Sequence, residues 1–157
     1  MIREYDITFI AKEFLARNNW QIIAFNPPGS QGTFTIPNPE KDPSFRGQTG
    51  SLSPDIIALK KVQNKNIFLI VESKSIFKKE DVVKMISMFS NNKRKKVFFN
   101  IAKGYAIANN IKYNENLQSE IHFAKAHSGN EDLVKNLSTI HIRLLFSNYW
   151  AVGNYPC

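Results

Sequence analysis

The segment from Ser53 to Lys74, SPDIIALKKVQNKNIFLIVESK, predicts two β-strands joined by a polar turn. The first strand runs from about Asp55 to Lys60 and begins with an acidic residue. The second strand runs from about Ile67 to Lys74 and carries its polar residues only at its end. We expect the two strands to pair as a hairpin through a turn at Gln63–Asn66.

The polar residues at the end of the second strand are Glu72, Ser73 and Lys74. Side chains two positions apart on a strand point to the same face, so Glu72 and Lys74 project together and Ser73 points away. In the expected hairpin, Asp55 lies near the Glu72 end of its neighbour. Two acids and a lysine therefore converge at one edge of a sheet.

The composition indicates one globular domain that spans residues 1–157. No apolar run is long enough to cross a membrane, and charged residues stand where a signal peptide would need a hydrophobic core, so we expect a cytoplasmic protein. The single cysteine, Cys157, excludes an internal disulfide and a cysteine-based zinc site. The formal net charge of +8 favours a polyanionic partner such as DNA, although a solvated basic surface gives the same charge.

The first helix is expected from about Ile2 to Asn18, because apolar residues recur there at helical spacing. On this helix Glu4 falls on the apolar side and Glu13 on the opposite side. An acid on the buried side of a helix needs a partner, which makes Glu4 a candidate site residue. The alternative is that Glu4 interacts only with the helix dipole.

A strand at Trp20–Phe25 is followed by a long segment, residues 26–53, that is rich in Pro, Gly, Ser and Asn. Only Thr33–Ile36 within it is a candidate short strand. A connection of this length in a small domain is typical of a functional loop or a mobile surface loop, and both readings stay open. It contains side chains suited to contacting phosphates or base edges of DNA: Gln31, Lys41, Arg46 and Gln48.

The chain after Lys74 predicts a helix from about Lys78 to Phe89 and then a strand at Val97–Ala102. The basic run between them, residues 93–96, includes Lys93 and Arg94 as candidate phosphate contacts. The alternative is a solvated turn that complements the dipole of the preceding helix. Beyond this point a short helix at residues 131–137, capped by Asn130, and a final strand near Thr139–Phe146 are predicted, and residues 104–111 and 121–127 fit either a strand or a helix.

Two neighbouring carboxylates repel each other and attract a divalent cation, and oxygen ligands suit Mg²⁺. A bound metal ion can polarise a phosphoryl oxygen and lower the pKa of a bound water. A lysine beside the ligands can orient that water or stabilise the charge of the transition state. The cluster of Asp55, Glu72 and Lys74 therefore favours phosphodiester hydrolysis.

Pro54-Asp55 followed by Glu72-Ser73-Lys74 resembles the motif of the PD-(D/E)XK nuclease superfamily, which includes many restriction endonucleases and the archaeal Holliday junction resolvases. The resemblance covers about residues 1–105, and residues 106–157 are a C-terminal elaboration without a counterpart. It implies an α/β fold, with a central mixed β-sheet flanked by helices in a restriction endonuclease-like core. The expected order of elements is a helix, three strands, a helix and a further strand.

The resemblance also implies roles for individual residues. Asp55 and Glu72 would be metal ligands, together with the backbone carbonyl of Ser73, and Lys74 would position or activate the attacking water. The first helix would contribute an acid, which is Glu4, with Glu13 in reserve. The cofactor would be Mg²⁺, with Mn²⁺ as a substitute.

The function expected on these grounds is that of a Mg²⁺-dependent endodeoxyribonuclease, most simply a restriction endonuclease that acts as a homodimer. One alternative is a structure-selective nuclease similar to the junction resolvases. Another is a DNA-binding module that keeps the fold without the activity. The long loop favours sequence-specific cleavage, and the intact motif argues against a non-catalytic module.

Overall fold

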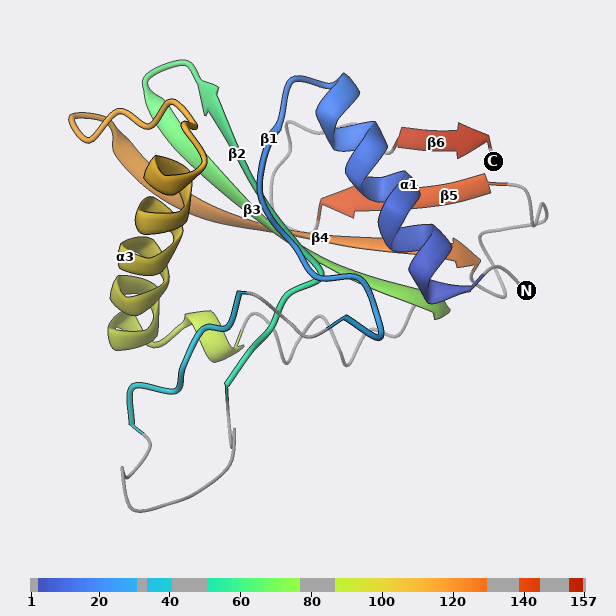
Figure 1. The fold of residues 1–157 in the computed structure, drawn as a ribbon, viewed down its shortest axis with the longest axis horizontal. Helices are drawn as coiled ribbons and strands as arrows, with labels where there is room; N and C mark the ends of the chain where they lie inside the picture. Colours follow the sequence, from blue (N-terminus) through green and yellow to red (C-terminus); the bar gives the residue numbers. More distant parts are fainter. Residues whose placement is uncertain are drawn as a thin grey trace.

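The apolar spacing of the chain produces two long helices, a helical stretch at residues 87–89 and six strands in the computed structural model, which describes residues 3–30, 34–40, 51–76, 87–129, 139–144 and 153–156 (Figure 1). The long helices are α1 (Glu4–Arg17) and α3 (Asn92–Ala108). The strands are β1 (Gln21–Phe25), β2 (Ile56–Val62), β3 (Lys65–Ile76), β4 (Gln118–Gly129), β5 (Thr139–Leu144) and β6 (Gly153–Pro156). Within these residues no helix is both long and apolar enough to cross a membrane.

Helix α1 forms because its apolar residues recur every four positions. Ile7, Ala11 and Leu15 are buried along one stripe, and Ile10 and Phe14 pack beside them. The helix ends where Asn19 adopts a positive φ of 63°, a conformation that asparagine tolerates better than most residues. The predicted first helix is therefore confirmed.

The predicted hairpin is also confirmed. Strands β2 and β3 pair antiparallel from Ile56↔Val71 to Val62↔Lys65, and β1 pairs antiparallel with the other edge of β2. The turn is shorter than predicted, because Lys65 and Asn66 already belong to β3. Gln63 makes this tight turn possible with a φ of 53°.

The sheet is mixed, since β4 runs parallel to β3 along nearly its whole length. Strands β5 and β6 continue the sheet in the order β1-β2-β3-β4-β5-β6. The expectation of an α/β fold with a mixed sheet packed against helices is thus confirmed. The expected boundary near residue 105 falls inside α3, and β4 from the C-terminal third lies beside β3.

The two faces of the sheet bury separate cores, because side chains alternate along each strand. One face packs against α1 through Ile56, Leu69, Val71 and Ala124, among others. The opposite face packs against α3 through residues that include Ile57, Phe68, Ile70 and Phe123. In Figure 1 α1 crosses the sheet at the end where β3 finishes, whereas α3 lies near the β2–β3 turn.

The prediction of a strand at Val97–Ala102 is wrong, because these residues lie within α3. Their apolar run fits a buried strand, but Phe98, Ala102 and Ala106 form the helical stripe that packs against the sheet. Asn91 begins the helix, and its side chain accepts hydrogen bonds from the backbone N–H groups of Lys93 and Arg94. The further strand of the expected order is instead β4.

The start of α3 also corrects the expectation for the basic run at residues 93–96. These residues lie in the first two turns of α3 and not in a solvated turn after the preceding helix, and they share the positive end of the α3 dipole. Most of the predicted helix at Lys78–Phe89 lies outside the described residues, and its described end, residues 87–89, is helical. The predicted short helix at residues 131–137 also lies outside the described residues. The candidate strand at Thr33–Ile36 is reduced, within the described residues, to a single bridge between Ile36 and Leu52.

Candidate metal and nuclease site

Asp55 stands immediately before β2, and Asn26 holds its backbone in place. The N–H of Asn26 donates to the Asp55 carbonyl at 2.7 Å, and its Nδ2 donates to the Pro54 carbonyl at 3.0 Å. The same Nδ2 lies 3.2 Å from the Phe34 carbonyl, and the Asn26 side chain is buried. Asn26, which follows β1, therefore forms hydrogen bonds with Phe34 in the loop and with Pro54 and Asp55 at the start of β2.

The Asp55 side chain continues the hydrogen bonding between β2 and β3. The backbone ladder ends at Ile56↔Val71, and beyond it the N–H of Ser73 donates to Asp55 Oδ2 at 2.6 Å. In a strand the N–H and C=O of one residue point to the same side, so the Ser73 carbonyl also faces this edge. Asp55 is therefore fixed next to a backbone oxygen.

Glu72 lies opposite Asp55 when the register of the hairpin is continued by one residue beyond Ile56↔Val71. Opposite residues of an antiparallel pair point to the same face, so the two carboxylates are neighbours. Burial raises the pKa of Asp55 to about 6, against the opposing effects of the Ser73 hydrogen bond and the Lys74 charge. Burial and then the Asp55 charge raise the pKa of Glu72 to about 8, while Lys74 and Lys125 act in the opposite direction.

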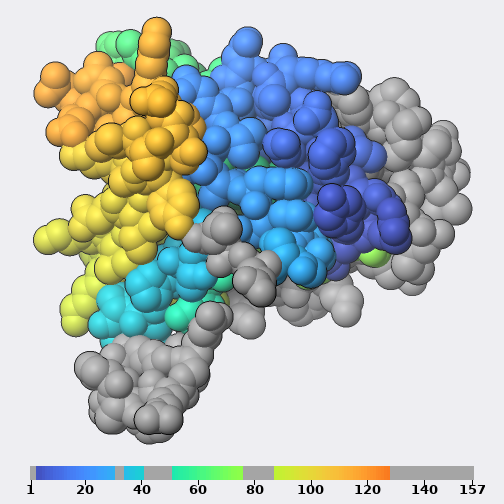
Figure 2. Space-filling model, viewed as in Figure 1, coloured from blue at the N-terminus to red at the C-terminus, as the bar shows by residue number. Residues whose placement is uncertain are grey.

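Lys74 forms an ion pair with Glu4, whose Oε1 lies 2.8 Å from the lysine Nζ. Burial opposes the charge on Lys74, but the hydrogen bond that Lys74 donates to Glu4 and the charges of the surrounding carboxylates outweigh it and raise the pKa of Lys74. In Figure 2 the end of β3 (light green) is visible beside the first turn of α1 (dark blue). The first helix thus brings its N-terminal acid to the candidate site.

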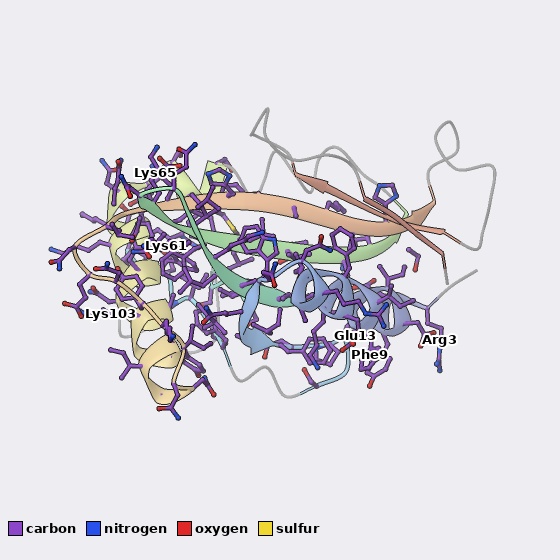
Figure 3. All side chains as sticks on the ribbon, turned by 90° about the horizontal axis from the view of Figure 1, so that it is seen from above. Arg3, Phe9, Glu13, Lys61, Lys65 and Lys103 are labelled. Atoms are coloured by element: carbon purple, nitrogen blue, oxygen red, sulfur yellow. The ribbon has the colours of Figure 1, made fainter. Side chains whose placement is uncertain are left out.

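Glu13, the reserve candidate for the helix acid, lies elsewhere. Figure 3 shows Glu13 near Phe9 on the side of α1 that faces away from the sheet. The structure therefore places Glu4, and not Glu13, beside Lys74.

Two residues of this cluster are not singled out by the sequence patterns. Lys125 and His127 on β4 are the ladder neighbours of Glu72 and Lys74, and both side chains are fully buried. They follow Phe123 at strand spacing, on the face that carries Glu72. The alternation of apolar and basic residues in IHFAKAH, residues 121–127, indicates a strand with basic side chains on one face. Only its pairing with β3 shows that these side chains lie beside Glu72 and Lys74.

The candidate DNA contacts are distributed differently. Gln31, Lys41, Arg46 and Gln48 lie outside the described residues. Lys93 is exposed in the first turn of α3, whereas the side chain of Arg94 is buried, with 8% of its surface accessible.

The donors available to a cation at this site are the two carboxylates of Asp55 and Glu72 and the Ser73 carbonyl. The described part of the chain contains no group of three or more His, Cys, Asp or Glu side chains that could hold a metal ion. Mg²⁺ commonly takes one or two carboxylates and completes its shell with water and phosphate oxygens, so the donor set is compatible with Mg²⁺. The raised pKa of Glu72 agrees with this, because the Asp55 charge is its second cause after burial and a cation would relieve that repulsion.

A cavity of about 440 Å³ lies elsewhere, between the start of α3 and the first half of β4. Its walls include Phe89, Lys95, Phe99 and His122, and none of the carboxylates of the candidate site. Comparison of the chain with protein-family models, curated proteins and solved structures finds no match, so the fold and the candidate site are the grounds on which its function can be inferred.

Proposed function

We propose that this protein is a Mg²⁺-dependent endodeoxyribonuclease of the PD-(D/E)XK type, most simply a restriction endonuclease with a restriction endonuclease-like core. The observation that carries the proposal is the convergence of Asp55 and Glu72 on adjacent strands, with Lys74 on the same face of β3. The order of α1, three antiparallel strands, α3 and a parallel β4 supports it, since the resemblance implies this order.

The carboxylates of Asp55 and Glu72 would hold the Mg²⁺ ion together with the Ser73 carbonyl, and Mn²⁺ would substitute. When bound, the ion would supply Lewis-acid activation of the scissile phosphate and of a water. The Ser73 N–H keeps Asp55 Oδ2 in a fixed position, which leaves Oδ1 as the less constrained oxygen.

Lys74 would hold the attacking water or offset the negative charge that develops on the phosphate. The ion pair with Glu4 keeps the lysine ammonium near the carboxylates, with 43% of its side chain still exposed. Glu4 then acts as an orienting partner of Lys74 and not as a metal ligand. The 2.8 Å contact between Glu4 Oε1 and Lys74 Nζ supports this orienting role of Glu4.

DNA is the proposed partner, because the chain carries a net charge of +8 and Lys93 is exposed. The homodimer expected of a small restriction enzyme remains part of the proposal, since two-fold symmetry would allow cleavage of both strands. Its mass in solution can be measured by analytical ultracentrifugation.

The test is incubation of the protein with mixed-sequence duplex DNA and with a four-way junction, in Mg²⁺ and in EDTA. We expect the wild type to cut duplex DNA in Mg²⁺ only, and Asp55→Ala and Lys74→Ala to lose activity. Lys61→Ala is a matched control, because Lys61 is exposed on β2 at the far end of the sheet (Figure 3). Cleavage of the junction alone would favour the resolvase-like alternative, and tight binding without cleavage would favour the non-catalytic module.

A further inference from the structure

Lys125 lies on β4 directly beside Glu72 in the parallel ladder, and none of its surface is exposed. Neighbouring strands are about 4.8 Å apart, so the side chains of paired residues leave the sheet close together. Both residues follow apolar positions, Ile70 and Phe123, of the core beneath α3. Lys125 therefore approaches Glu72 from the strand opposite to the one that carries Asp55.

A buried ammonium group is rare in proteins unless a negative charge compensates it. Glu4, the acid of the first helix, contacts Lys74. Asp55 lies on the β2 side of Glu72, whereas Lys125 lies on its β4 side. Among the described residues, Glu72 is the carboxylate in register with Lys125. The charge of Lys125 acts on Glu72 in the direction that favours its ionised form, which agrees with this placement.

We propose that Lys125 is a positioning residue of the candidate site: its ammonium group holds the Glu72 carboxylate beside Asp55, in the orientation that a divalent cation needs. The metal-binding part of this inference rests on the proposed function, whereas the pairing of Lys125 with Glu72 does not. Without this attraction, Glu72 would be free to turn away from the Asp55 carboxylate, which repels it.

The two lysines would then have separate tasks. Lys74 is partly exposed and pairs with the first helix, so it can face the substrate. Lys125 is enclosed, so it cannot face the substrate, and it acts on the site through Glu72. Because Lys125 reaches Glu72 from the β4 side, the Asp55 side of Glu72 stays open to a cation.

A double-mutant cycle in EDTA at about pH 9, where the Glu72 carboxylate is ionised, tests the pairing without metal or DNA. We expect Lys125→Met to lower the unfolding temperature of the wild type by several degrees, and by much less in a Glu72→Gln background. An equal loss in both backgrounds would overturn the proposal. If Lys125→Met alone does not fold, adding Glu72→Gln must recover a folded protein, and failure to do so counts against the pairing.

Calorimetric titration with Mn²⁺ tests the positioning role in the folded variants. Partners that orient a metal ligand typically change metal affinity about 10–100-fold, so we expect Lys125→Met to weaken Mn²⁺ binding by that factor. Lys61→Met, the same change at an exposed site of β2, should leave it unchanged. Unchanged or tighter binding in Lys125→Met would contradict the positioning role. A wild type that binds no Mn²⁺ would refute the proposed function and the positioning role, while the cycle in EDTA still decides the pairing.

Discussion

The Asp55 carboxylate accepts the backbone N–H of Ser73 at 2.6 Å, where the ladder between β2 and β3 would otherwise stop. Residue 54, which precedes Asp55, is proline, and its carbonyl accepts a hydrogen bond from Asn26 Nδ2 instead of from Ser73. The aspartate side chain thus takes the place of a main-chain acceptor. A candidate catalytic carboxylate is held by the same hydrogen bonding that builds the sheet.

Asp55→Asn should stabilise the metal-free protein at pH 8. Burial gives folded Asp55 a pKa of about 6, above its usual value near 3.9, so the folded state binds more protons than the unfolded chain between these values. The stability of the wild type therefore falls as the pH rises through this range. Asparagine avoids the cost of ionising a buried carboxyl group, and its side-chain oxygen still accepts the hydrogen bond from the Ser73 N–H. We expect a gain of about 1–3 kcal/mol at pH 8 and almost none at pH 4.

Thermal unfolding in EDTA between pH 4 and pH 8 measures this difference. Asp6→Asn is the matched control, because Asp6 is paired with Arg3 at the surface of α1 and Arg3 lowers its pKa. Its unfolding temperature should change little relative to wild type between pH 5 and pH 8. If the difference in unfolding temperature between wild type and Asp55→Asn does not grow with pH, ionisation of Asp55 does not destabilise the folded protein.

Binding of Mn²⁺ should strengthen as the pH rises from 6 to 8. A metal ligand must be deprotonated, and folded Glu72 has a pKa of about 8, so a proton must leave at lower pH. Loss of one proton gives a rise of up to about tenfold in affinity per pH unit. Calorimetry at three pH values in two buffers of different ionisation enthalpy measures both the affinity and the proton release. A constant affinity would exclude Glu72 as a ligand.

Glu4→Gln should reduce DNA cleavage while it leaves stability nearly unchanged. The ion pair with Lys74 is partly exposed, and such pairs typically contribute about 0–1 kcal/mol to stability. Loss of the carboxylate releases Lys74 from its position, so we expect cleavage to fall about 10-fold or more. Glu13→Gln, on the same helix but facing away from the sheet, should behave as wild type in both measurements. Equal effects of the two variants on cleavage would remove Glu4 from the site.

Asn26→Ala should lower both stability and cleavage. It leaves two carbonyl groups, those of Phe34 and Pro54, without this buried donor, and an unsatisfied buried group costs about 1–3 kcal/mol. Because Pro54 precedes Asp55, we also expect weaker Mn²⁺ binding. Asn109→Ala removes a similar but exposed hydrogen bond, to the Tyr105 carbonyl, and should cost less than about 1 kcal/mol. Denaturant unfolding and Mn²⁺ titration of both variants make the comparison.

Local patterns in the sequence were sufficient to predict the hairpin and the first helix. The apolar runs after Asp55 and before Glu72 and the four-residue spacing from Ile7 to Leu15 reflect interactions between near neighbours. The pairing of these strands then brings Asp55 and Glu72 together, as expected. Glu4 approaches Lys74 because α1 packs across the end of β3, which its position on the buried side of the helix had suggested.

Local patterns could not predict which distant segments of the chain pack or pair with each other. A short apolar run such as Val97–Ala102 suits a buried strand and a buried helix equally, and only the cap at Asn91 and the stripe through Phe98 separate them. The role of Lys125 depends on its register with Glu72 in the parallel pair of β3 and β4. These two strands are far apart in the sequence, so no local sequence pattern specifies how they pair.

The parallel pairing of β3 with β4 also affects the order in which the molecule is assembled. The hairpin that carries Asp55, Glu72 and Lys74 can form from contiguous chain, whereas β4 can dock only after α3 has been made and has crossed over. Closing such a long loop is slow compared with forming a hairpin. During synthesis on the ribosome, the acidic motif therefore emerges before Lys125, and we expect the growing chain to acquire its complete site only late in translation.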